Sequence, residues 1–177
     1  IEKEKSKKIK KEKVFLTNKK RGSFSMRKYF SEEQIEVLKQ FDSLNRTRFI
    51  VGQMFSSLED KAGDCYIGHL KRVSFPFDEN SDEYIIALLH DLVEDTDYTI
   101  EDLVSMGFSK NITDAIALMT HADDVAYMDY VCRIKNNPIA KVVKLADLKH
   151  NSDLTRLDVV DEKALKRKEK YEKAIKI

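Results

Sequence analysis

Residues 84–95 decide how this chain folds, and they read Tyr84-Ile85-Ile86-Ala87-Leu88-Leu89-His90-Asp91-Leu92-Val93-Glu94-Asp95. An apolar run leads directly into His90 and Asp91, and two further acids, Glu94 and Asp95, follow one helical turn later. At about 100° per residue, a single helix over residues 82–95 would place these four side chains within an arc of about 140°. Because unpaired buried charge is costly, three carboxylates and an imidazole beside an apolar helix favour a bound divalent metal. The alternative is a solvated helix end in which His90 is a hydrogen-bonded core residue.

Two other segments offer similar side chains next to apolar positions. His69 ends the stretch Tyr66-Ile67-Gly68-His69, just ahead of another helical pattern, and Asp147 follows Val142-Val143-Lys144-Leu145-Ala146. Two imidazole nitrogens and two carboxylates without a thiolate favour Mn²⁺, Fe²⁺ or Mg²⁺ over a structural zinc site. Glu94 and Asp95 would then lie beside the metal, where a hydrolase needs a general acid or base. The pattern predicts a metal-dependent hydrolase with the ligands His69, His90, Asp91 and Asp147.

These motifs resemble those of a known family. The matching stretches are Lys61-Ala62-Gly63 through Tyr66-Ile67-Gly68-His69, then Ala87-Leu88-Leu89-His90-Asp91-Leu92-Val93-Glu94-Asp95-Thr96, then Val143-Lys144-Leu145-Ala146-Asp147 with Asn151 four residues on. Over about residues 44–177 the chain looks like the HD superfamily of phosphohydrolases. Within that superfamily it is similar to the hydrolase domain of RelA/SpoT homologues, which remove the 3′-pyrophosphate from the alarmone (p)ppGpp. The resemblance implies an all-α, HD-domain helical bundle that acts on a small-molecule nucleotide.

The resemblance also implies roles for individual residues. His69, His90, Asp91 and Asp147 would hold Mn²⁺, Glu94 and Asp95 would be the catalytic acids, and Asn151 would contact the nucleotide. Lys61, Tyr66 and Lys144 are further candidates for phosphate or base contacts. Asp60 and Asp153 stand where the family usually carries arginines. The alternatives are therefore another nucleotide substrate, such as a nucleoside monophosphate or the 2′-phosphate of NADPH, and a non-catalytic nucleotide- or RNA-binding module.

Length and composition predict one hydrolase domain over residues 29–177. The 177 residues can bury a sizeable core, which predicts a stand-alone hydrolase without synthetase or regulatory domains. The two cysteines cannot form a disulfide framework, and Cys65 is expected to be a small buried residue. No apolar run approaches the roughly 20 residues that span a membrane, and no hydrophobic leader opens the chain. We expect a reduced, cytoplasmic compartment; the oligomeric state stays open.

Charge is distributed unevenly along the chain. Residues 1–28 hold 12 Lys and Arg against 3 Glu, a net charge of +9, whereas residues 29–177 hold 20 Lys and Arg against 28 acids, a net charge of −8. Residues 1–28 are therefore interpreted as a basic N-terminal extension, solvated or in part non-native. A basic tail can bind RNA through counterion release, but this one carries no recognisable nucleic-acid motif, so nucleic acid is an expected partner only through the tail.

Helix signals extend along most of the chain after residue 30. A capping box at residues 31–34 opens the first predicted helix, and a second apolar pattern from Phe49 ends near Gly63. Caps at Thr99, Asn137 and Asp161 predict three later helix starts, and the helix that begins after Asn137 would deliver Asp147. No alternating strand pattern is present. His121 and His150 could approach the pocket, but they are expected to be structural or to face solvent.

Overall fold

The computed structural model describes residues 30–60 and 62–177, and these residues fold into helices. Within these ranges there is no strand, and an isolated bridge between Glu59 and Cys65 is the sole β-type pairing. The predicted all-α fold class is therefore confirmed. The basic extension at residues 1–28 and the predicted substrate contact Lys61 lie outside the described residues.

Four of the described helices begin at the caps that the sequence predicts. Ser31 and Thr99 form capping boxes, and the side chains of Asn137 and Asp161 accept hydrogen bonds from first-turn amides. The helices are α2 (Glu32–Lys39), α3 (Ser43–Phe55), α4 (Tyr66–Ser74), α5 (Asp82–Leu89), α6 (Leu92–Asp95), α7 (Ile100–Ser105), α8 (Lys110–Met119), α9 (Tyr127–Ile134), α10 (Pro138–Ser152) and α11 (Glu162–Ile175), with a 3₁₀ turn over Leu154–Arg156.

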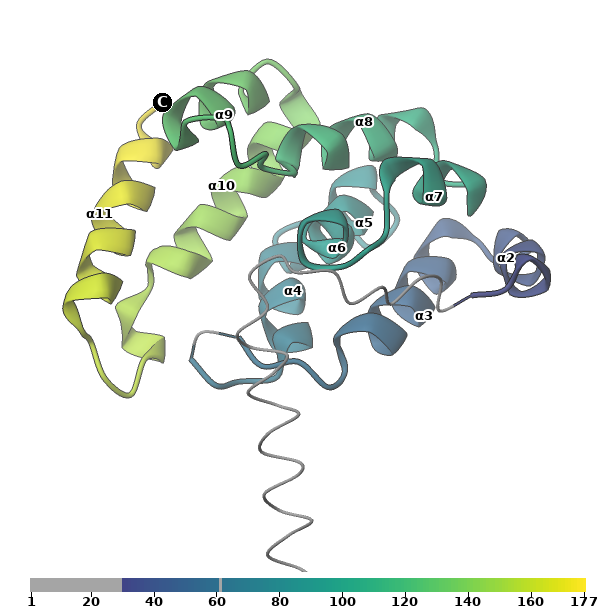
Figure 1. The fold of residues 1–177 in the computed structure, drawn as a ribbon, viewed down its shortest axis with the longest axis horizontal. Helices are drawn as coiled ribbons and strands as arrows, with labels where there is room; N and C mark the ends of the chain where they lie inside the picture. The colour runs from purple at the N-terminus through teal and green to yellow at the C-terminus, as the bar shows by residue number, and fades with distance from the viewer. Residues whose placement is uncertain (1–29, 61) are drawn as a thin grey trace, which may run out of the picture.

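Helix α5 lies at the centre of the molecule. It packs against α3, α4, α8 and α10, while α10 also packs along α11 and across α4 (Figure 1). Ile86, Ala87 and Leu89 have no exposed surface, which is the behaviour of a helix that is apolar all round. Residues 84–89 thus belong to the core helix, and the predicted ligands follow directly at its C-terminal end.

The predicted single helix over residues 82–95 is in fact two helices. Helix α5 ends at Leu89, and α6 begins at Leu92 after a turn formed by His90 and Asp91. The His90 Nδ1 atom lies 2.9 Å from the carbonyl oxygen of Ala87, the acceptor that an uninterrupted helix would pair with the Asp91 amide. The arc calculated for one continuous helix is therefore wrong, because a side chain takes the place of a backbone donor.

The segment before His69 also differs from the prediction. Helix α3 ends at Phe55 rather than near Gly63. The chain then forms a loop in which the backbone carbonyl of Leu58 accepts a hydrogen bond from the Tyr66 amide. Gly63 has φ +84°, a left-handed conformation that ordinary side chains rarely adopt, and it closes this loop. Helix α4 then begins at Tyr66, so His69 lies inside the helix rather than ahead of it.

Arg46 joins the ends of two peripheral helices. Its buried guanidinium group donates to carbonyl oxygens beyond the helix to which it belongs: those of Leu38, Lys39 and Phe41 at the end of α2, and that of Gly107 after α7. One planar cation therefore satisfies carbonyl groups that helix ends leave unpaired.

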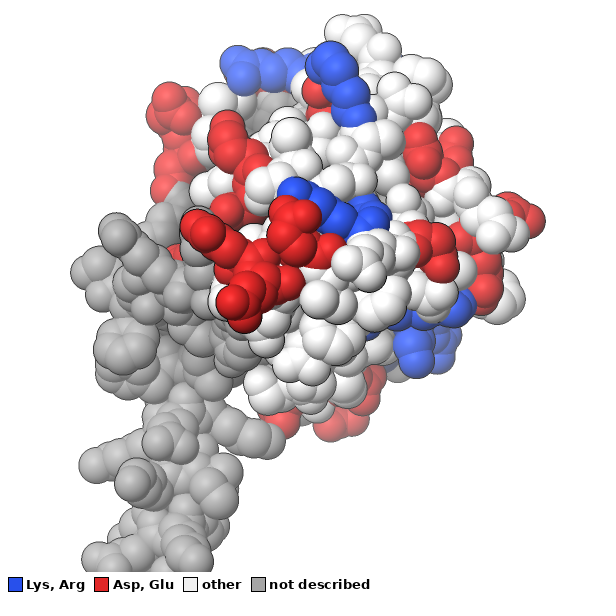
Figure 2. All heavy atoms as spheres, turned by 90° about the vertical axis from the view of Figure 1, so that its right-hand side faces the viewer, with Lys and Arg blue, Asp and Glu red and all other residues white. Residues whose placement is uncertain are grey.

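Acidic side chains lie on the side of the molecule that carries α2 and α7. Figure 2 shows acidic side chains gathered near the middle of this face. Both helices carry acids in their first turns, Glu32 and Glu33 in α2 and Glu101 and Asp102 in α7. Clustered carboxylates of this kind repel phosphate groups. None of the described helices has the length and apolar character needed to cross a membrane.

Candidate metal centre

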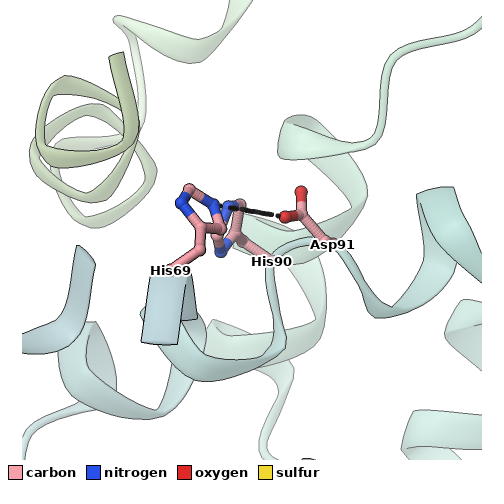
Figure 3. A group of neighbouring side chains, drawn as sticks. All are labelled: His69, His90 and Asp91. Carbon is pink, nitrogen blue, oxygen red and sulfur yellow. Dashed lines mark ion pairs between the residues drawn. The ribbon is translucent and has the colours of Figure 1, made fainter. Parts of the chain in front are cut away.

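Three predicted ligands meet at the C-terminal end of α5. His69 projects from α4, His90 and Asp91 project from the turn between α5 and α6, and all three side chains point toward one another (Figure 3). Each offers one ligand atom, and these atoms lie within 4.8 Å of one another. The Asp91 Oδ2 atom is 3.2 Å from His90 Nε2 and 3.5 Å from His69 Nε2.

Asp147 brings the fourth predicted ligand from α10. Its Oδ1 atom lies 3.5 Å from His69 Nε2 and 3.7 Å from His90 Nε2, and the residue is only 4% exposed. The structure therefore brings the two imidazoles and two carboxylates together from three separate parts of the chain. Two carboxylates with two imidazole nitrogens form a donor set that suits Mn²⁺ or Fe²⁺.

His90 provides the test of whether a cation fits. Its Nδ1 atom is engaged with the Ala87 carbonyl, and its fully buried Nε2 atom has no hydrogen-bond partner of good geometry. Burial opposes a charge on this ring, but the carboxylates of Asp91 and Asp147 raise the pKa of His90 well above its usual value. The site therefore attracts positive charge at Nε2, and a divalent cation held by the same carboxylates would satisfy that buried atom.

Lys144 and Asn151 face Asp147. The Lys144 Nζ atom lies 2.9 Å from Asp147 Oδ2, and the Asn151 side-chain amide donates to Asp147 Oδ1. Burial by itself would lower the pKa of Lys144, yet the Asp147 carboxylate raises it well above its usual value. Both residues thus orient the fourth predicted ligand. Their predicted contacts with substrate stay predictions.

Glu94 and Asp95 lie on α6, next to the four clustered residues. The Glu94 Oε2 atom accepts a hydrogen bond of 3.2 Å from the amide of His121. The Tyr66 hydroxyl lies 2.6 Å from Asp91 Oδ2 and 2.7 Å from Asp95 Oδ2, although it has a single proton to donate. Tyr66, a predicted substrate contact, therefore joins a predicted ligand to a predicted catalytic acid.

Asp95 differs from the other acids in its affinity for a proton. Loss of solvation and the nearby Asp91 carboxylate raise the pKa of Asp95 to about 6. A protonated Asp95 can donate to the Tyr66 oxygen while the Tyr66 hydroxyl donates to Asp91. The pair of acids on α6 thus combines a carboxylate held by a backbone amide with a carboxyl group that takes up a proton near neutral pH.

Two further residues lie behind His69, and only Arg156 was not considered from the sequence. The Nδ1 atoms of His69 and His150 lie 2.8 Å apart, so His150 is a neighbour of the cluster. Arg156 contacts His150 and forms an ion pair with Asp60. Burial and the Arg156 charge lower the pKa of His150 to about 4. The spacing of three residues between Asp147 and His150 on one helix was the available signal; nothing in the sequence indicated Arg156.

The remaining positions have structural roles. Asp60 accepts hydrogen bonds from the amides of Ala62 and Asp64, and Asp153 caps the 3₁₀ turn through the amide of Thr155. The prediction of a buried Cys65 is wrong: this residue is exposed, because it lies in the loop before α4 rather than inside a helix.

Comparison of the chain with models of known protein families, and with curated protein sequences, found no match. A functional assignment therefore depends on the chemistry of the clustered side chains.

Proposed function

We propose that this chain is a metal-dependent phosphohydrolase of the HD type, with Mn²⁺ as its metal and Fe²⁺ or Mg²⁺ as alternatives. The observation that carries the proposal is the buried Nε2 atom of His90, which lacks a hydrogen-bond partner and faces the carboxylates of Asp91 and Asp147. A buried nitrogen without a hydrogen-bond partner, next to two carboxylates, destabilises the fold. A bound cation would satisfy the nitrogen and neutralise the carboxylates.

The cluster and the acids on α6 divide the chemistry between them. His69, His90, Asp91 and Asp147 would hold the metal, which when bound makes a water molecule more acidic and neutralises charge on a phosphoryl oxygen. Glu94, oriented by the His121 amide, would position or deprotonate the attacking water. Asp95, with its pKa of about 6, would give a proton to the leaving oxygen.

The proposed substrate is the alarmone (p)ppGpp, on the resemblance of the motifs. One water molecule would be added across the 3′-ester bond, which releases GDP or GTP and pyrophosphate. Asp60 favours a second candidate, hydrolysis of another nucleotide phosphate. An aspartate cannot supply a cationic side chain to a guanine base. The Asp60 carboxylate instead pairs with Arg156 and accepts hydrogen bonds from two loop amides.

A substrate panel tests the proposal. Purified protein in Mn²⁺ would be incubated with ppGpp, NADPH, a nucleoside monophosphate and deoxynucleotides, and the products would be separated by ion-exchange chromatography. We expect pyrophosphate and GDP from ppGpp. The variants His90→Ala and Asp147→Ala should lose both Mn²⁺ and turnover, whereas Asp114→Ala, which removes an exposed acid on α8, should keep both.

The outcomes separate the two candidates from a misassigned site. Turnover of another nucleotide without cleavage of ppGpp would replace the alarmone by that substrate. Full metal occupancy in His90→Ala and Asp147→Ala would overturn the metal centre. Metal binding without turnover of any member of the panel would favour a non-catalytic nucleotide-binding module.

A further inference from the structure

His69 and His150 form a pair of imidazoles in which only one proton can lie between the two rings. Their Nδ1 atoms are 2.8 Å apart and their ring centroids are 4.9 Å apart. A neutral imidazole has one nitrogen that donates and one that accepts. One Nδ1 atom must therefore donate, and the direction of this hydrogen bond decides which nitrogen of His69 is left for a metal.

Arg156 determines that direction. A guanidinium group has only donors, and the Arg156 Nη1 atom lies 3.4 Å from both the Nδ1 atom and the backbone oxygen of His150. The other terminal nitrogen of Arg156 pairs with Asp60, whose side-chain surface is only 9% exposed. The His150 Nδ1 atom thus faces a fixed cation and has to present a lone pair. It accepts, and His69 Nδ1 donates.

In a neutral His69 ring, the opposite nitrogen is then free of its proton. His69 Nε2 lies 3.5 Å from Asp91 Oδ2 and 3.5 Å from Asp147 Oδ1, on the side of the ring that faces the other ligands. A metal-binding imidazole needs a bare nitrogen on that side, and its other N–H group needs a fixed acceptor. His150 supplies that acceptor.

We propose that His150, oriented by Arg156 and Asp60, is a positioning residue that fixes the tautomer of His69 so that Nε2 is available to a divalent cation. This inference rests on the proposed metal centre. In this arrangement Asp60 and Arg156 contact neither metal nor substrate. Their ion pair connects the loop before α4 to the 3₁₀ turn after α10, and it holds His150, the hydrogen-bond acceptor of His69, in place.

The tautomer can be measured without any metal. Long-range ¹⁵N–¹H correlation spectra of the metal-free protein at pH 8 should show a protonated Nδ1 atom on His69 and a bare Nδ1 atom on His150. A bare Nδ1 atom on His69 would overturn the proposal. Because this readout needs neither Mn²⁺ nor substrate, it stands even if the proposed hydrolase activity fails.

Metal affinity gives the second test. His150→Phe removes the acceptor, and Mn²⁺ titrations followed by electron paramagnetic resonance should show binding about 10- to 100-fold weaker. His150→Asn places an amide oxygen where Nδ1 stood and should restore most of the affinity. Lys149→Ala, an exposed neighbour on α10, is the matched control and should bind Mn²⁺ as the parent does.

Arg156→Gln keeps the test decisive if His150→Phe fails to fold. Loss of the guanidinium group frees the direction of the hydrogen bond, so the His69 spectrum should show both tautomers and Mn²⁺ should bind more weakly. Parental Mn²⁺ affinity in folded His150→Phe or in Arg156→Gln would refute the positioning role. Absence of Mn²⁺ binding by the parent protein would instead refute the metal centre itself.

Discussion

Single carboxyl groups at the candidate metal centre differ sharply in how firmly they hold a proton. Burial alone would raise the pKa of Asp147, but the Lys144 ammonium and His90 bring it below its usual range. Burial opposes the Asp91 charge too, but His90 lowers the pKa of Asp91 well below its usual value. Asp95, with no cation that outweighs its loss of solvation, has a raised pKa. Neighbouring acids therefore differ in their affinity for a proton, as the proposed roles of metal ligand and proton donor require.

Replacement of Glu94 tests its proposed role as the general base. Glu94→Gln keeps an oxygen that can accept from the His121 amide, so the local structure should persist while the ability to take a proton is lost. Turnover of the substrate found in the panel should fall about 10²- to 10⁴-fold with Mn²⁺ binding unchanged. Glu101→Gln, an exposed change in α7, serves as the control. Near-parental turnover of Glu94→Gln would remove Glu94 from the mechanism.

Asp60 makes a prediction about acid stability. Burial opposes its charge, but the amides of Ala62 and Asp64 and the Arg156 cation lower its pKa in the folded state. Its contribution to the free energy of unfolding is therefore fully present above the ordinary aspartate pKa of about 3.9, and is lost as the pH falls through the lower folded value.

Denaturant unfolding from pH 2.5 to pH 7 checks this prediction. The difference in unfolding free energy between the parent and Asp60→Asn should be constant above about pH 5 and should shrink below about pH 4. Asp64→Asn, in the same loop with an exposed side chain, is the matched control. A difference that stays constant across the whole range would show that the Asp60 charge adds no stability.

At the scale of helices, we expect the Arg46 side chain to contribute more to the free energy of unfolding than any other residue outside the apolar core. Arg46→Ala leaves carbonyl groups at the ends of α2 and α7 without their donor, and we expect a loss of about 2–4 kcal/mol in the free energy of unfolding. Arg48→Ala removes a neighbouring arginine whose exposed ion pair with Glu79 should contribute less than about 1 kcal/mol. Equal losses in the two variants would contradict the assigned role of Arg46.

The helix starts could be predicted because their signals are local. The caps at Ser31, Thr99, Asn137 and Asp161 act on amides within three residues, so the sequence contains the whole interaction. The break after α5 could not be predicted in this way. It depends on the His90 ring reaching back to a carbonyl while its other nitrogen faces groups from α4 and α10, and periodicity does not report such contacts.

The candidate site likewise combines residues that local sequence patterns predict with residues that only long-range contacts define. Apolar runs ahead of His90 and Asp147 indicated buried helices that end in polar side chains, and the structure brings those residues together with His69. The roles of His150 and Arg156 depend on contacts across 81 and 96 positions, with His69 and Asp60 respectively. Such long-range pairs have no signature in a single sequence.

For the whole molecule, bound metal should act as a stabilising ligand. A cation that binds only the folded state at a free concentration of 100 times its Kd adds about 2.7 kcal/mol, which corresponds to about 5–10 °C in Tm for a chain of this size. Differential scanning calorimetry with Mn²⁺ and with a chelator measures the shift. Asp147→Ala should abolish it and Asp114→Ala should retain it; an equal shift in Asp147→Ala would place the metal elsewhere.

Removal of residues 1–28 should leave turnover of a small nucleotide unchanged. The first described residue, Phe30, is 4% exposed and packs against Phe49 and Tyr98, so a deletion that stops at residue 28 preserves this contact. Steady-state kinetics of the shortened and full chains provide the comparison. Loss of activity in a shortened protein that still folds and binds Mn²⁺ would show that the basic segment belongs to the site.

The contact between His69 and His150 has a consequence for synthesis on the ribosome. Translation releases α4 and the α5–α6 turn well before α10, because 81 positions separate the two rings. A nascent chain that stops short of α10 lacks Asp147, its lysine and amide partners, and the acceptor behind His69. Products that end before α10 therefore cannot assemble the four-residue cluster, and the proposed metal centre can form only after α10 has left the exit tunnel.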